Sequence, residues 1–167
     1  MLSTVFQHII VDGLLFSMVL GAFVMASLWY NPRLWLQDYP QVVRDKVPPM
    51  TAQEKRLQKI IVVPCLLLMV GAPYLSVTLV KAANGGTITF PLAYLTAVGV
   101  LQMFNLFDAV VLDYLILVHM KPAFAIIPST TSEDSFDVGL AFQVRNFLKG
   151  VVICAVLALP IAFVASL

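Results

Sequence analysis

Four long apolar windows, separated by polar and charged segments, dominate the pattern of side chains along this chain. They cover residues 9–29, 60–80, 91–116 and 148–167. Each has close to or more than the roughly 20 residues with which an apolar α-helix crosses about 30 Å of hydrocarbon. The pattern therefore predicts an all-α integral membrane protein, in which residues 1–167 form a single domain: an antiparallel bundle of four transmembrane helices.

The first window could also be a secretory signal peptide. We expect a retained span instead, because Met1–Ile10 contains no Lys or Arg and the apolar run exceeds the roughly 7–15 residues of a signal sequence.

The segments between the windows carry their own signals. Thr51 and Glu54 have the spacing of a capping box, which predicts a helix that starts at Thr51 and runs into the second window. Residues 84–86, Asn-Gly-Gly, predict a tight turn, because Asn and Gly tolerate a positive φ. Residues 31–40 have the amphipathic composition of a segment in the headgroup layer. Residues 129–137 are polar and acidic, and we expect a mobile loop there.

Basic residues are distributed unequally between the two sides of this predicted bundle. Nine of the ten follow the first or the third window: Arg33, Arg44, Lys46, Lys55, Arg56 and Lys59, then Lys121, Arg145 and Lys149. Only Lys81 falls on the other side. Because loops rich in Lys and Arg stay in the cytoplasm, we expect both termini outside and two cytoplasmic loops, in a bacterial-type inner (plasma) membrane.

The composition excludes a soluble globular domain. Hydrophobic residues make up 60% of the chain and charged residues 11%, with a mean hydropathy of +0.94, whereas soluble domains are about 25% charged. Cys65 and Cys154 lie in apolar windows and are interpreted as buried, inert thiols. Motifs for phosphate binding, metal-dependent or serine hydrolysis and nucleic-acid binding are absent from the sequence. We therefore expect no cofactor, no metal and no nucleic-acid partner.

Polar side chains form a stripe along the third window. At about 100° per residue, Gln102, Asn105, Asp108, Asp113 and His119 fall within an arc of about 140°. A carboxylate that faced lipid at a helix centre would cost about 2.5–3.5 kcal/mol, so the stripe is expected to face protein or water. Asp108 lies about 25 Å along the helix, near the inner leaflet.

We predict that Asp108 and Asp113 pair with basic residues at the same depth. Arg145 and Lys149 open the last window, and Arg33 stands at the inner end of the first. The candidate ligand-binding site comprises Gln102, Asn105, Asp108, Asp113, His119, Arg145, Lys149, Arg33 and Asn31. The same pattern also fits a purely structural role, with ion pairs at the membrane boundary and interhelical hydrogen bonds from the two amides. Both interpretations stay open at the level of the sequence.

Two weaker signals lie in the other spans. His8 and Asp12 stand one helical turn apart, which predicts a local hydrogen bond rather than a metal site, because two ligands are too few. Ala158 and Ala162 have the small-xxx-small spacing that lets helices approach closely.

Three functions fit these features. The first is a membrane component that binds or transports a lipid-like amphiphile or an ion at the polar cluster, as a homo-oligomer, with anionic lipid headgroups at the cytoplasmic face. The second is a structural or assembly subunit of a membrane complex. The third is a lipid-modifying membrane enzyme with Asp108 or Asp113 as general base and His119 as its companion.

Overall fold

The computed structural model describes residues 2–167, and it contains helices and no strand over that range. Four helices are long and apolar enough to cross a membrane: α1 (Leu2–Tyr30), α3 (Ala52–Ala83), Phe90–Met120 and α6 (Leu140–Ser166). The third of these consists of α4 (Phe90–Phe107) and a π-helical continuation, η2 (Asp108–Met120). Each contains or closely matches one predicted window, so the predicted all-α class with four helices of membrane-spanning length and hydropathy is confirmed.

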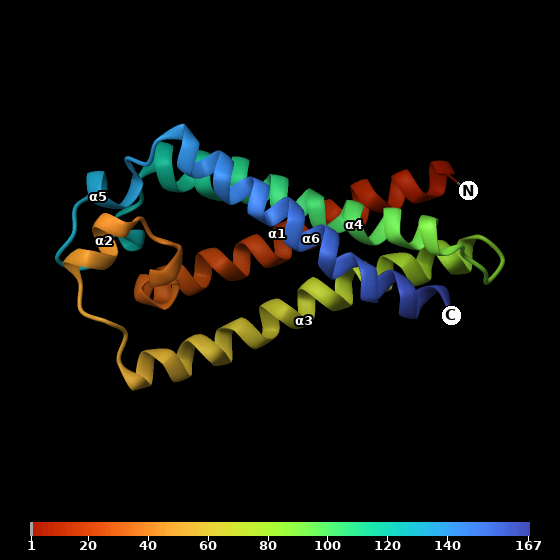
Figure 1. Ribbon diagram of the computed structural model, residues 1–167, viewed down its shortest axis with the longest axis horizontal. Helices are drawn as coiled ribbons and strands as arrows, with labels where there is room; N and C mark the ends of the chain where they lie inside the picture. Colours follow the sequence, from red (N-terminus) through yellow and green to blue (C-terminus); the bar gives the residue numbers. More distant parts are fainter. Residues whose placement is uncertain (1) are drawn as a thin grey trace.

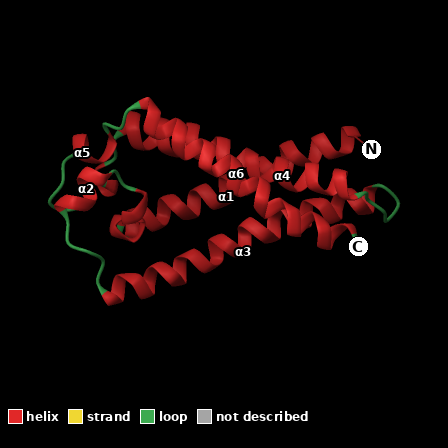
Figure 2. Cartoon of the chain, viewed as in Figure 1, coloured by secondary structure: helices red, strands yellow, loops and turns green. Residues whose placement is uncertain are grey.

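The connecting segments form short helices at one end of the molecule, here termed the loop end (Figures 1 and 2). They are η1 (Pro32–Asp38), α2 (Gln41–Lys46), η3 (Ala123–Ala125) and α5 (Ser132–Phe136). The opposite, terminal end carries both chain termini and the turn between α3 and α4 (Figure 1).

Helix α4 is packed between α1 and α6. Ala93 and Ala97 of α4 are fully buried, as are Ala158 and Ala162 of α6. Lipid tails are as apolar as these side chains, so close backbone approach at small residues is what holds membrane helices together. The predicted small-residue spacing in the last span therefore lies at a packed helix surface.

Helix α3 packs against the other spans over only part of its length. Its buried residues lie between Cys65 and Val80, and none of residues 52–64 is buried. Figure 1 shows α3 diverging from α1 toward the loop end. At the terminal end, Lys81 Nζ donates a hydrogen bond to the carbonyl oxygen of Ala165 at 3.2 Å and ties α3 to α6.

Two predictions for the ends of α3, the capping box and the tight turn, are confirmed. Thr51 Oγ1 accepts from the Glu54 backbone N–H at 3.2 Å, and the Glu54 carboxylate accepts from the Thr51 N–H at 2.7 Å. Gly85 and Gly86 have φ values of 75° and 84°, which is the backbone region that glycine occupies at little steric cost. The reversal between α3 and α4 therefore needs few residues.

At the loop end, the two connecting segments pack on each other around an apolar cluster. This loop-end cluster comprises Leu34, Leu36, Tyr39, Val43, Val47, Met50 and Ile127. The Tyr39 hydroxyl donates to the carbonyl oxygen of Ala125 at 2.6 Å, and Lys46 Nζ contacts Asp134 at 2.6 Å. Residues 129–137, expected to be a mobile loop, contain the short helix α5. The buried Phe136 side chain holds this segment against the protein, which its acidic composition does not indicate.

Candidate functional site

The polar stripe of the third span divides where the α-helix becomes a π-helix, at Asp108. A helical wheel of about 100° per residue describes α4 but not η2, because a π-helix forms i→i+5 hydrogen bonds. Residues five apart then lie about one turn apart on one face. Asp108 and Asp113 have this spacing, so η2 brings together two carboxylates that an α-helix would separate by about 140°.

The two amides of the stripe tie α4 to α6. Gln102 Nε2 donates to the carbonyl oxygen of Val151 at 2.9 Å. Asn105 Nδ2 lies 3.2 Å from Gln102 Oε1 and 3.3 Å from the carbonyl oxygen of Phe147. A Cβ at Gly150 would overlap the Asn105 amide, so this glycine makes the approach possible. These contacts are the interhelical hydrogen bonds that the structural interpretation predicts.

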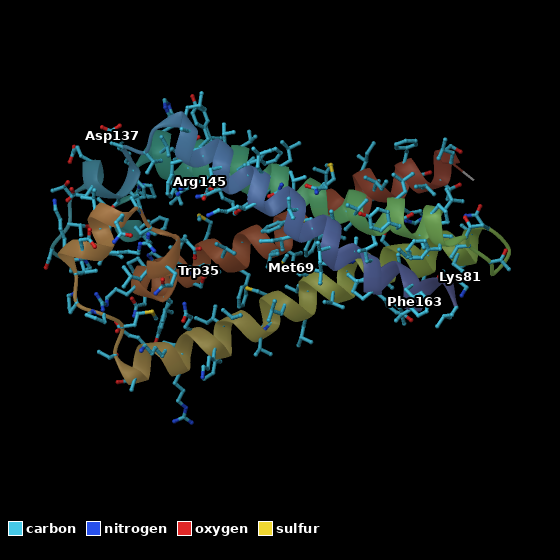
Figure 3. The ribbon with its side chains drawn as sticks, viewed as in Figure 1. Trp35, Met69, Lys81, Asp137, Arg145 and Phe163 are labelled. Atoms are coloured by element: carbon cyan, nitrogen blue, oxygen red, sulfur yellow. The ribbon has the colours of Figure 1, made fainter. Side chains whose placement is uncertain are left out.

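An open apolar cavity of about 320 Å³ lies between α1, α3 and η2, toward the loop end. Its volume is in the range of small-molecule sites. The apolar walls include Leu20, Leu28, Val62, Met69 and Leu112, and Trp35 of η1 also lines it. Asp108 and Asp113 line the same cavity. Trp35 and Met69 mark this region in Figure 3.

A second, smaller cavity of about 80 Å³ lies between η1, η2, α5 and the start of α6. Its lining is more polar and includes Asp38, Ser135, Gln143 and Asn146. Asp113 lines this polar cavity as well as the apolar one. This carboxylate therefore stands where an apolar space between the spans meets a polar space at the loop end.

The predicted ion pairs of Asp108 and Asp113 do not form. Within residues 2–167, the ion pairs join His8 to Asp12, Arg33 to Glu54, and Lys46 to Asp134. The prediction that Arg145, Lys149 and Arg33 neutralise the two carboxylates is therefore wrong.

Arg145 and Lys149 point away from the carboxylates because of the register of α6. Both are exposed, and the Arg145 guanidinium lies over the Phe142 ring at 5.6 Å. Figure 3 shows Arg145 on α6, away from Trp35 and Met69. The amides Gln143 and Asn146 take the inward positions instead. Long basic side chains can reach the headgroup layer from such an outer face, which lowers the need for an internal partner.

The remaining candidates are also apart from the carboxylates. Arg33 Nε donates to Glu54 at 2.6 Å, and its Nη2 donates to the carbonyl oxygen of Pro48 at 3.0 Å. Asn31 Oδ1 accepts from the Arg33 backbone N–H at 3.0 Å and caps η1. His119 is exposed near the end of η2 and lines neither cavity. Arg33 and Asn31 therefore fix the start of η1 and the start of α3.

A separate polar cluster lies in the terminal half, between α1 and α3. His8 Nδ1 lies 2.8 Å from Asp12 Oδ2, so the predicted local hydrogen bond is confirmed. Ser76 Oγ donates to the same carboxylate oxygen at 2.7 Å. Asp12 thus has two partners, one from its own helix and one from α3.

Several residues at these sites lack a sequence signal. Ser76 is one of three hydroxyl residues in its stretch of an apolar window, with Tyr74 and Thr78, and nothing in the sequence distinguishes it as an interhelical partner. The sequence around Trp35 and Asp38 is typical of a segment in the headgroup layer. In the structure, η1 folds back against the spans, so that each of these residues lines a cavity. Gln143 and Asn146 lie three apart just before the last window, a spacing that could have indicated a polar inward face.

Two groups at the loop end have shifted pKa values. A hydrogen bond from Lys46 holds the pKa of Asp134 below its ordinary value of 3.8. Burial raises the pKa of the Tyr39 phenol. Both therefore stay in their usual charge states at neutral pH and support the docking of the two connecting segments. Within residues 2–167, no three His, Cys, Asp or Glu side chains gather into a group that could hold a metal ion.

Comparisons with known proteins returned no match to a protein-family model, to a curated protein or to a solved structure.

Proposed function

We propose that this protein binds or transports a lipid-like amphiphile, or an ion, within the membrane at the apolar cavity between α1, α3 and η2. The observation that carries this proposal is the position of Asp113, which lines both the apolar and the polar cavity. An amphiphile needs adjoining apolar and polar surfaces, and this junction offers both. Intramembrane ionisable residues also raise the expectation of a functional site.

The orientation is part of the proposal. The loop end carries nine of the ten Lys and Arg residues, and the positive-inside rule supports a cytoplasmic location for it. The cavity would then open near the inner leaflet, with both termini outside. Arg145 and Lys149, exposed on α6, would contact anionic lipid headgroups, each worth about 1 kcal/mol. A homo-oligomer fits transport best, because one chain of this size encloses little volume.

Two adjacent valines on α3 provide a matched test. Val62 lines the cavity, whereas Val63 is 54% exposed and is not among the lining residues. Val62→Trp fills the cavity, and Val63→Trp adds the same side chain to the outer face. Each variant is purified in a mild neutral detergent, and the lipids that co-purify are quantified by mass spectrometry. We expect Val62→Trp to lose a lipid that wild type and Val63→Trp retain.

Two results oppose this proposal. Wild-type protein that is folded and carries no specific lipid would contradict binding of an abundant amphiphile. Equal lipid content in the two tryptophan variants would place the bound lipid outside the cavity.

An assembly subunit is the second candidate, and one observation favours it. Arg145 and Lys149 lie with Val144, Leu148 and Val152 along a shallow groove on α6. A partner helix with acidic residues would fit this face. Arg145→Gln together with Lys149→Gln would then change the mass of the complex in native mass spectrometry, whereas lipid binding in the cavity would be unaffected. The enzyme hypothesis gains no support, since His119 is not among the residues that line either cavity.

A further inference from the structure

The charge of the cavity indicates the chemical class of its ligand. Asp108 and Asp113 are the only charged side chains among the described residues that line it, and Lys, Arg and His are absent from that lining. The rest of the lining is dominated by apolar residues. An occupant that complements this surface has a positive group and a hydrocarbon portion.

The basic residues of the loop end do not compensate these carboxylates. Arg33 is bound to Glu54 at 2.6 Å and Lys46 to Asp134 at 2.6 Å. Arg145 and Lys149 are exposed on the outer face of α6. Asp108 and Asp113 are half-buried, and removing a carboxylate from water without a partner is costly. Asp12 in the terminal half, by contrast, has both His8 and Ser76 as partners. The contrast shows that this chain can supply partners to a carboxylate within a span.

We propose that the amphiphile bound in this cavity has a cationic, amine-type head group, which Asp108 and Asp113 receive while its chain lies along the apolar walls. This inference rests on the proposed function and specifies its ligand. The π-helical backbone is what brings the two carboxylates to one face. Hydrogen bonds between charged groups are about twice as strong as neutral ones, so the head group is the main source of selectivity.

Trp35 allows a direct measurement of occupancy. The chain has two tryptophans; Trp35 lines the cavity, and Trp29 is 74% exposed. Trp29→Phe leaves Trp35 as the sole emitter, and Trp35→Phe leaves Trp29 to report the surrounding bilayer. The probes are three alkyl chains of equal length with bromine near the tail, which quenches tryptophan on contact, and with an ammonium, a hydroxyl or a carboxylate head. Both variants are reconstituted in bilayers of zwitterionic lipid.

We expect the ammonium probe to quench Trp35 at a concentration about tenfold lower than the hydroxyl probe, because a charged hydrogen bond is about twice as strong as the neutral one that a hydroxyl forms. Quenching of Trp29 measures how much of each probe enters the bilayer. After correction for that amount, Trp29 should show no preference for the ammonium probe. Asp108→Asn and Asp113→Asn should each reduce the preference, and the double variant should remove it. Glu133→Gln, at an exposed residue of α5, is the matched control and should leave it unchanged.

The outcomes separate the inference from the function on which it rests. Equal quenching of Trp35 by all three probes, unaffected by the Asp variants, would overturn the cationic head group and leave amphiphile binding intact. Quenching of Trp35 no greater than that of Trp29 by every probe would overturn both. Asp113→Glu keeps the charge if an Asn variant fails to fold, and it should retain the preference for ammonium.

Discussion

The two halves of the membrane-spanning region treat their carboxylates differently. In the terminal half, Asp12 also lines an apolar cavity, of about 290 Å³ between α1 and α3, but it receives hydrogen bonds from His8 and Ser76. Toward the loop end, Asp108 and Asp113 line cavities without forming any ion pair within residues 2–167. A charged residue in a span is therefore insufficient evidence for a binding site; the presence or absence of protein partners distinguishes the two cases.

The close approach of α4 and α6 at Gly150 predicts the largest effect. Gly150→Val would place a Cβ where the Asn105 amide lies and separate α4 from α6. Overpacking costs typically about 1–3 kcal/mol, and we expect a loss of unfolding free energy of that size in detergent. Gly71→Val on α3 is the control, because nothing lies within 4 Å of its added Cβ. Equal losses in the two variants would show that overlap with the Asn105 amide is not the cause of the loss at Gly150.

Replacing each carboxylate with leucine tests whether Asp12 contributes to stability and Asp108 and Asp113 do not. Asp12→Leu removes two hydrogen bonds, each worth about 0.6 kcal/mol in a membrane protein, so we expect a loss of about 1 kcal/mol. Asp108→Leu and Asp113→Leu remove no partner and should leave the unfolding free energy unchanged or raised. Equilibrium unfolding in mixed micelles measures the unfolding free energy of all three variants. A larger loss at Asp108 than at Asp12 would reverse the assignment of structural and functional roles.

The amides on α4 predict a smaller coupling. Gln102 and Asn105 contact each other and the backbone of α6. We expect a double-mutant cycle of Gln102→Leu and Asn105→Leu to give a coupling of about 0.6 kcal/mol. A coupling near zero would show that each amide binds α6 independently.

The smallest expected effect is a pH dependence at the loop end. Lys46 lowers the pKa of Asp134 in the folded state relative to the ordinary value of 3.8. A depressed pKa adds stability above the unfolded value, and this contribution is lost as the pH falls through the folded value. The protection of residues 127–137 against hydrogen exchange, corrected for the intrinsic pH dependence of amide exchange, should therefore be high at neutral pH and lower below about pH 4. Asp134→Asn should show less of this acid-induced change than wild type.

The sequence predicts those features that depend on local chemistry. The four spans, the Thr51 capping box and the turn at residues 84–86 follow from hydropathy, side-chain capping and glycine conformation. The contacts of Gln102 and Asn105 also follow from a regular α-helix, because α4 is one. His8 and Asp12 interact within a single helical turn.

The predictions that are wrong concern properties that only tertiary packing determines. The change to a π-helix at Asp108 has no composition signal, so the helical wheel misplaces Asp113. The register of α6 decides that Arg145 faces outward, and a count of charges at the same depth cannot show this. Ser76 meets Asp12 only because α1 and α3 are adjacent at the terminal end.

The short turn between α3 and α4 has a mechanical consequence. With Ala83 held near Phe90 by that turn, a change in the tilt of α3 is a rotation about its terminal end. Val62 lies about 32 Å from Ala83 along the helix axis, so a tilt of 5° moves it by about 3 Å. Such a tilt would widen or narrow the cavity by about the diameter of a water molecule while each helix keeps its own structure.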